Sequence, residues 1–244
     1  QRELVRSYFL EFATKVSTAL DELGIEFCQG NLMAMNPKWT HSLSHWKRNY
    51  DQWISDASQE TAMNYSTFFD CRAIFGEESL LADLKEHMKG LLKDAPERFF
   101  INLGHNALQY EPPLTFFRKI KTEDIEGKKQ LNLKQTLRPI VDLARVYALR
   151  FEISETNTIQ RINNLQKKGV FTEKEAQELT HAFEYLMNLR LENQANILLD
   201  QHQKPKNYIK LERLTKVQQV TLTEIFKVIE EFQARIKLTF TRSL

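Results

Sequence analysis

The sequence is short of the residues that make tight turns. It has seven glycines and six prolines in 244 residues. Sheet proteins with many tight turns use more of both, so their scarcity favours long helices with few connections. Two cysteines, Cys28 and Cys71, are too few for a disulfide framework, and they lack the clustered spacing of a zinc site.

The sequence also lacks a large excess of charge of one sign and a long apolar run. The 34 basic and 32 acidic residues leave a formal net charge of +2, which gives no global attraction to nucleic acid or to a membrane surface. No apolar stretch reaches the ~18 residues of a membrane span, and no signal peptide is recognisable. These absences predict a cytoplasmic protein in which any anion site is local. Because Gln1 opens the chain inside a helical pattern, we also expect a segment upstream of it.

Apolar residues at helical spacing, together with helix-capping residues, predict helices through most of the chain. A stripe of Trp39, Leu43, Trp46, Tyr50 and Trp53 follows Asn36-Pro37, a typical helix start, and predicts a helix packed on a core rather than a base-stacking surface. The other predicted helices span 3–23, 78–93, 96–108, 139–151, 158–168, 172–201 and about 211–240. From Pro139 onward only helices are predicted, in an antiparallel bundle.

Four short segments favour strands. They are residues 25–28, residues 67–75, and a pair at 116–121 and 130–133 with Gly127 in its turn. The predicted fold is therefore mainly α (α+β). We place a domain boundary after Tyr110, which divides the chain into a small α/β part, residues 1–110, and a helical bundle, residues 111–244.

Asp70 is the most informative polar residue. On a strand it would share a face with Arg72, and a rigidly held carboxylate suits magnesium, which prefers oxygen ligands. The alternative is a structural ion pair with Arg72 or with another helix. Taken alone, one carboxylate favours the ion pair. The histidines His41 and His45 have the i, i+4 spacing of metal ligands, but no third ligand is suggested nearby.

A second candidate site surrounds the predicted helix start at Pro139. Lys134 and Arg138 would flank free backbone N–H groups, which makes a local phosphate site. Asp142 and Arg145 are three residues apart and share a face of the same helix. The alternative is that these charged side chains face solvent and bind no ligand.

A third candidate lies on the apolar stripe of the long helix 172–201. Arg190 and Gln194 occupy positions on that stripe and must find polar partners or line a cleft. An ion pair between Arg190 and Asp142 and a cleft-lining role are equally compatible with the sequence.

Long motifs carry a family resemblance along essentially the whole chain. In the first half they are Cys28-x-Gly30-x-x-Met33-Ala34-x-Asn36-Pro37-x-Trp39, then Phe68-Phe69-Asp70-x-Arg72. In the second half they are Leu137-Arg138-Pro139-Ile140-Val141-Asp142-Leu143-Ala144-Arg145, then Asn157-Thr158, Arg161, Ala182-Phe183, Arg190-Leu191 and Gln194. The chain resembles bacterial nucleotidyltransferases of signalling proteins, followed by their substrate-binding domain. The family is similar to the uridylyltransferase of the PII signalling protein and to the adenylyltransferase of glutamine synthetase.

The resemblance implies a fold like that of DNA polymerase beta, with a Gly-Ser element and three acidic residues around Mg²⁺. Asp70 matches the third acid, as catalytic residue and metal ligand. The Gly-Ser element and the acidic pair have no match in these 244 residues, so we expect this chain alone to be inactive and to lack Mg²⁺. Asn132 departs from the aspartate expected before Leu133-Lys134.

The expected activity of the complete protein is transfer of a nucleoside monophosphate from a nucleoside triphosphate to a protein acceptor in signal transduction. The alternative is a non-catalytic nucleotide-sensing or protein-binding adaptor. The resemblance also implies CBS-pair and cyclic-nucleotide-binding domains upstream in the same polypeptide, with no nucleic-acid or membrane partner. The expected substrate-binding and phosphate-binding residues, which should meet on one surface, are Arg72, Lys134, Arg138, Asp142, Arg145, Arg161 and Arg190.

Overall fold

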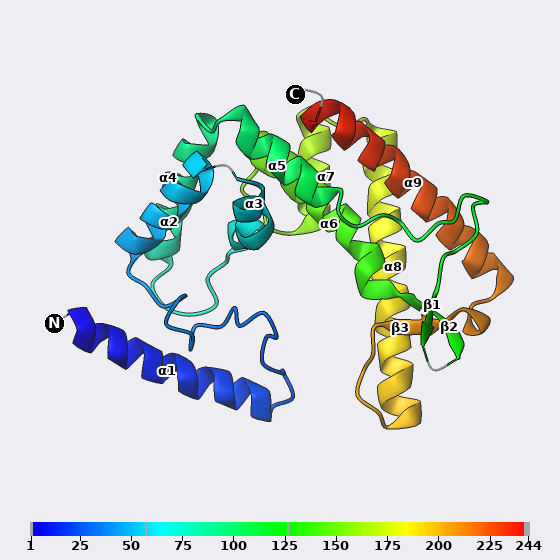
Figure 1. The fold of residues 1–244 in the computed structure, drawn as a ribbon, viewed down its shortest axis with the longest axis horizontal. Helices are drawn as coiled ribbons and strands as arrows, with labels where there is room; N and C mark the ends of the chain where they lie inside the picture. The colour runs from blue at the N-terminus through cyan, green and yellow to red at the C-terminus, as the bar shows by residue number, and fades with distance from the viewer. Residues whose placement is uncertain (1, 57, 126, 242–244) are drawn as a thin grey trace. The chain divides into compact units, whose positions relative to one another are not determined.

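The computed structural model describes residues 2–56, 58–125 and 127–241. The chain is 66% helical, and the described residues form nine α-helices and one three-stranded antiparallel sheet (Figure 1). The prediction of a mainly α fold is therefore confirmed. None of the described helices combines the length and the hydropathy that crossing a lipid bilayer requires.

Contacts divide the chain into two compact units. The first contains the residues up to Gln52 together with Phe75–Met88. The second contains Trp53–Ile74 together with the chain from Lys89 onward. Helices α2 (Leu43–Asp56) and α4 (Glu78–Lys93) each contribute to both units.

The first unit contains α1 (Arg2–Glu22) and the initial parts of α2 and α4. Two polar contacts join α2 to α4: Lys47 Nζ lies 2.8 Å from Asp83 Oδ1, and His87 Nε2 lies 2.7 Å from Asp51 Oδ1. The prediction that the tryptophan stripe packs is supported, because Tyr50 is fully buried and the Trp39 and Trp46 rings stack.

Two predictions in this unit are wrong. Residues 25–28 are not a strand, and α2 begins at Leu43 rather than after Asn36. Asn36 caps a turn instead, since its side-chain oxygen accepts a hydrogen bond from the Lys38 backbone N–H. The apolar residues of α1 are largely exposed, with Leu4 at 79% and Tyr8 at 64%.

The second unit is a helical assembly with a small sheet at the end where α9 begins (Figure 1). Its complete α-helices are α3 (Gln59–Tyr65), α5 (Glu97–Ala107), α6 (Leu133–Arg150), α7 (Thr158–Lys167), α8 (Glu173–Gln201) and α9 (Lys216–Phe240). Two 3₁₀ helices, η1 (Ser66–Asp70) and η2 (Leu211–Arg213), complete it. Helix α6 contacts α5, α7, α8 and α9, so most of its side chains are buried.

One predicted helix cap is confirmed. Thr172 and Glu175 form the predicted capping box at the start of α8. A second capping box, made by Thr215 and Gln218, starts α9 at Lys216 rather than near Leu211. Helices α5 and α9 cross closely at Gly104, where an added Cβ would lie 2.7 Å from the Phe240 Cβ.

The sheet is made of different segments from those predicted. Strand β1 (Glu123–Ile125) pairs antiparallel with β2 (Lys128–Asn132), with Gly127 in the turn, and β2 pairs antiparallel with β3 (Tyr208–Lys210). Residues 116–121 are not a strand, although Leu114 and Ile120 make an isolated antiparallel bridge. Strand β3 was missed because three residues carry too little periodicity to be recognised.

Residues 67–75 are not a strand either. Ser66–Asp70 is a 3₁₀ helix, and the chain becomes extended at Cys71. Strand-forming residues were a misleading signal here, because a strand needs a neighbour for its backbone hydrogen bonds and none of the described residues supplies one. The aromatic residues serve packing instead: Phe69 is buried against Phe99, and the Phe68 ring lies 5.4 Å from that of Trp53.

Helix α6 begins at Leu133, six residues before the predicted start. Asn132 is its N-cap, and its side-chain oxygen accepts a hydrogen bond from the Gln135 backbone N–H. Pro139 therefore lies inside the helix, where it leaves the Gln135 carbonyl without the usual helical donor. The free helix start predicted beside Arg138 is therefore wrong, because Arg138 lies inside α6.

Candidate functional site

Asp70 ends η1 in a position fixed by its aromatic neighbours. Phe69 is 5% exposed and anchors η1 against α5. The Asp70 side chain is 22% exposed and lies against α6 and α7. A residue that follows a buried aromatic anchor has little freedom to move, so its carboxylate is held in place.

Two arginines bind this carboxylate. Arg145 on α6 donates from Nε and Nη2 to Asp70 Oδ2, at 2.8 and 2.7 Å. Arg161 on α7 donates from Nη2 to Asp70 Oδ1 at 2.5 Å. Such charge-assisted bonds are stronger than neutral ones. The carboxylate therefore ties η1 to two helices that come 75 and 91 residues later in the chain.

The network continues outward along α6. Arg145 Nη1 donates to Asp142 Oδ1 at 2.6 Å, and Arg138 Nε lies 3.6 Å from Asp142 Oδ2. The Arg138 guanidinium lies over the ring of Tyr110, 4.0 Å from its centroid, and donates to the Tyr110 hydroxyl at 2.8 Å. The Arg138 side chain is 50% exposed. It is the outermost charge of what we call the Asp70 cluster: Asp70, Arg138, Asp142, Arg145 and Arg161.

The pKa values of the two carboxylates of the cluster are shifted in opposite directions. Burial by itself raises the pKa of Asp70, but the hydrogen bonds from Arg161 and Arg145 outweigh burial and hold that pKa below its usual value. Burial raises the pKa of Asp142 above its usual value. The hydrogen bond from Arg145 and the longer contact with Arg138 lower this pKa but do not outweigh burial, and the nearby Asp70 charge raises it further. Of the two, Asp70 is the firmly ionised group.

Arg161 is the most deeply buried charged residue in the described part of the chain, with 1% exposure. Its Nε donates to the Glu155 backbone carbonyl at 2.6 Å, and its Nη2 binds Asp70. Its Nη1 is buried and has no hydrogen-bond partner among the described residues. A buried guanidinium with one unused donor depends strongly on the partners that it has, so Asp70 is its main source of compensation.

Three of the eight predicted site residues lie outside the cluster. Arg72 and Lys134 are exposed, and neither forms a hydrogen bond or ion pair through its side chain with a residue that the structure describes. Arg190 does not pair with Asp142. Its Nε donates to the Asn207 side-chain oxygen at 2.9 Å, and Gln194 donates to the same oxygen at 3.3 Å. Arg190 and Gln194 therefore fix the segment that leads into β3.

Sequence reasoning missed Tyr110 and Asn207. Tyr110 precedes Pro112-Pro113 in a loop, and its backbone carbonyl accepts a hydrogen bond from Gln233 Nε2 on α9 at 2.8 Å. No periodic pattern in the sequence marks Tyr110, a loop residue whose hydroxyl binds Arg138 on α6, 28 positions later. The signal for Asn207 was indirect, because two polar residues on a buried stripe require a polar partner.

The donor set of the cluster does not fit magnesium. Asp70 is a single carboxylate whose oxygens accept three hydrogen bonds, and two guanidinium charges beside it oppose a further cation. Within the described part of the chain, no three His, Cys, Asp or Glu residues are grouped to hold a metal ion. We therefore derive no step through a metal at Asp70.

The model of the family "Putative nucleotidyltransferase substrate binding domain" matches residues 97–240, more than half of the chain. The chain belongs to this family. The model "Putative nucleotidyltransferase DUF294" matches residues 1–60. No curated protein and no solved structure matches the chain.

The substrate-binding match contains most of the Asp70 cluster. Arg138, Asp142, Arg145 and Arg161 all lie within residues 97–240, whereas Asp70 lies between the two matched ranges. The carboxylate of Asp70 thus joins a segment outside the substrate-binding match to two helices inside it.

Proposed function

We propose that this chain is the acceptor-side part of a nucleotidyltransferase that moves a nucleoside monophosphate from a nucleoside triphosphate to a protein acceptor. The order of the two family matches carries this proposal: nucleotidyltransferase first, substrate-binding domain second. The resemblance to uridylyl- and adenylyltransferases of signalling proteins supports a protein acceptor and a cytoplasmic role. It also supports CBS-pair and cyclic-nucleotide-binding domains as regulatory partners in the same polypeptide.

In this proposal the Asp70 cluster positions the substrate-binding helices. Its three arginines exceed its two aspartates by one positive charge, and Arg138 presents the charge nearest to solvent. A half-exposed guanidinium held by an aromatic ring and a carboxylate suits an anionic group such as a phosphate. Arg138 is thus the proposed phosphate contact, and Asp70 is a positioning residue.

The second candidate function is a nucleotide-sensing or protein-binding adaptor without catalysis. None of the seven glycines in these 244 residues is followed by serine, so this chain supplies no Gly-Ser element of its own. The observation that favours this alternative is the Asp70 carboxylate, whose oxygens already accept hydrogen bonds from Arg145 and Arg161. A module of this kind would bind the same ligands and carry out no transfer.

A labelling experiment separates the two functions. The polypeptide in its full cellular length is incubated with magnesium, each of the four α-labelled nucleoside triphosphates and a cell extract. We expect one nucleotide to label an acceptor protein, and the 244-residue chain alone to label none. Excess 244-residue chain should reduce the labelling, and added purified acceptor should restore it.

The outcomes distinguish acceptor binding from nucleotide sensing. Recovery of labelling by extra nucleoside triphosphate, rather than by extra acceptor, supports the sensor. No labelling by any of the four nucleotides overturns the transferase proposal. An Arg138→Gln chain should compete less well than the wild-type chain, whereas Lys174→Gln, which changes an exposed charge on α8, should compete equally.

A further inference from the structure

The loop that follows α5 contains a turn with two exposed phenylalanines. Phe116 is 93% exposed and Phe117 is 79% exposed. Their rings contact each other edge to face, with the centroids 5.5 Å apart. Single exposed apolar residues are common on protein surfaces, but two adjoining aromatic rings form an apolar patch, which indicates an interaction site. We call residues 115–119 the phenylalanine turn.

Backbone hydrogen bonds hold this turn in one conformation. The Arg118 N–H donates to the Thr115 carbonyl at 2.9 Å, and the Thr115 N–H donates to the Lys119 carbonyl at 2.8 Å. The bridge between Leu114 and Ile120 continues this pairing. Arg118 has a φ of 59°, in the left-handed region that such hairpin loops usually fill with glycine. The chain thus keeps a strained residue at the position that follows the two exposed rings.

Helix α9 anchors both ends of the loop. The Arg118 guanidinium pairs with Glu230, and the Tyr110 carbonyl accepts a hydrogen bond from Gln233 Nε2 at 2.8 Å. Glu230 and Gln233 are three residues apart and therefore lie on one face of α9 (Figure 1). Because the loop is already ordered, a partner that binds the two rings loses little affinity to ordering it.

The charges beside the rings are positive. Lys119 and Lys121 are exposed, and neither forms an ion pair with a residue that the structure describes. The charge of Arg118 is compensated by Glu230. The surface complementary to this turn is therefore an apolar pocket with acidic groups at its rim.

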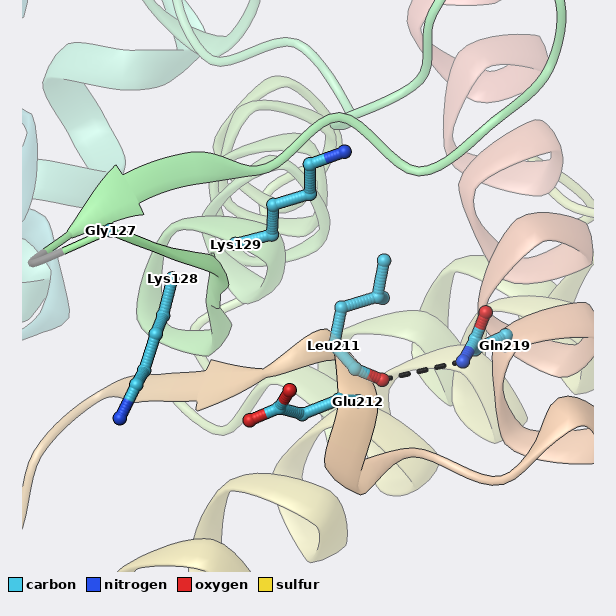
Figure 2. A pocket seen from close by; sticks show the side chains of 6 residues that line it. All are labelled: Gly127, Lys128, Lys129, Leu211, Glu212 and Gln219. Atoms are coloured by element: carbon cyan, nitrogen blue, oxygen red, sulfur yellow. Dashed lines mark hydrogen bonds between the residues drawn. The ribbon is translucent and has the colours of Figure 1, made fainter.

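A second copy of this chain is a poor fit. Figure 2 shows a pocket of about 410 Å³ at the sheet of the second unit, lined by Gly127, Lys128, Lys129, Leu211, Glu212 and Gln219. Two of these lining residues are lysines, which would repel the lysines of an entering phenylalanine turn. Contact between two such turns would bring like charges together. It would also bury only roughly 300–500 Å² per copy, whereas a stable dimer needs about 800 Å².

A membrane surface also fits less well than a protein. A loop that binds anionic lipid relies on several free cations, and this turn has two. Acidic residues flank the loop on both sides, since Glu111, Glu123 and Asp124 are all exposed. Their charges oppose those of anionic lipids.

We propose that the phenylalanine turn docks onto a second protein, which presents an apolar pocket with an acidic rim. Phe116 and Phe117 enter the pocket, and Lys119 and Lys121 face the acidic groups. None of these residues belongs to the Asp70 cluster, so the proposal does not depend on nucleotidyl transfer.

Capture followed by titration tests the proposal. The immobilised 244-residue chain and its variant Phe116→Ser/Phe117→Ser are exposed to a cell extract, and a protein that only the wild type retains is purified. In calorimetric titration, this protein should bind the double variant at least about tenfold more weakly than the wild type. The control Leu198→Ser/Leu199→Ser removes two exposed apolar side chains of α8 and should bind as the wild type does.

The lysines give a second readout. Lys119→Gln/Lys121→Gln should weaken binding and reduce its dependence on salt, because the charges that attract the acidic rim are removed. The Tm of the phenylalanine double variant should equal that of the wild type within about 1 °C, since neither ring is buried.

Four results would overturn the proposal. The first is a decrease in that Tm by more than about 3 °C, which would assign the rings to the fold. The second is a dimer, detected by sedimentation, that the double variant fails to form. The third is binding to vesicles of phosphatidylcholine and phosphatidylserine that depends on the two phenylalanines. The fourth is that no purified protein binds the wild type more tightly than the double variant.

Discussion

The substitution Asp70→Asn tests the central interaction of the second unit. Asparagine has the size of aspartate but no charge, and it replaces one oxygen acceptor by an NH₂ donor. That donor would face the guanidinium groups of Arg145 and Arg161, which are donors themselves. Arg161 is 1% exposed, so water cannot replace the lost partner.

The expected loss of stability is large. Removing one partner of a buried ion pair costs about 3–5 kcal/mol. The Asp70 side chain is 22% exposed, which places the cost at the lower end, about 3 kcal/mol. In a unit of this size, 1 kcal/mol lowers the Tm by about 2–4 °C, so the expected decrease is about 6–12 °C.

Differential scanning calorimetry of the 244-residue chain measures this change, and urea unfolding gives the free energy of unfolding. Asp83→Asn is the matched control. Asp83 pairs with Lys47, but its side chain is 55% exposed, so its replacement should change the free energy of unfolding by no more than about 0.5 kcal/mol.

A Tm for Asp70→Asn within about 2 °C of the wild type would refute the conclusion that Asp70 stabilises the fold by binding Arg145 and Arg161. That result would support the role that the sequence suggested, in which the Asp70 carboxylate binds a ligand or a metal ion and contributes little to stability. On the sequence alone, a metal ligand predicts an unchanged Tm. The structure reverses that expectation because it shows two guanidinium groups bound to the same carboxylate.

Three further predictions concern pH, packing and a polar contact. The pKa of Asp70 is lower in the folded than in the unfolded state, so its ion pairs stabilise the fold above about pH 4 and lose that effect as the pH falls further. The difference in free energy of unfolding between the wild type and Asp70→Asn, measured with urea, should therefore shrink below about pH 4. Gly104→Ala should lower the free energy of unfolding by about 1–3 kcal/mol, because the added Cβ would lie 2.7 Å from a side-chain carbon of α9. Gly90→Ala is the control: its Cβ meets nothing within 4 Å, so it should stabilise α4 by up to about 1 kcal/mol. Thermal unfolding of both variants tests these values. A double-mutant cycle between Arg190 and Asn207 should give a coupling of about 1.5 kcal/mol, and a coupling near zero would contradict the observed hydrogen bond.

Much of the helical fold could be predicted from the sequence because its signals are local. The capping residues Thr172 and Glu175 and the helical spacing of apolar residues determine where α8 begins. The start of α6 was misplaced because Pro139 was given the usual position of a proline near a helix start. The actual signal, the N-cap Asn132, competed with a predicted strand over the same residues.

The candidate site was predicted only in part. The sequence singled out Asp70, Asp142, Arg145 and Arg161 by their charge, their spacing and the family motifs. It could not pair Asp70 with Arg145 or Arg161, which come 75 and 91 residues later. It left the partner of Arg190 open, and the ion pair with Asp142 that it allowed is not formed; Asn207, the actual partner, lies in a connection that carries no periodic pattern.

By itself, then, the sequence determined the helical class, most helix limits and the family, since each depends on local spacing or on motif identity. Only the tertiary structure decided that η1 is not a strand, because a strand depends on a neighbour that may be far away in the chain. The same holds for the charges. Whether Asp70 is an open carboxylate or a saturated one depends on where α6 and α7 place their arginines, and packing alone fixes that.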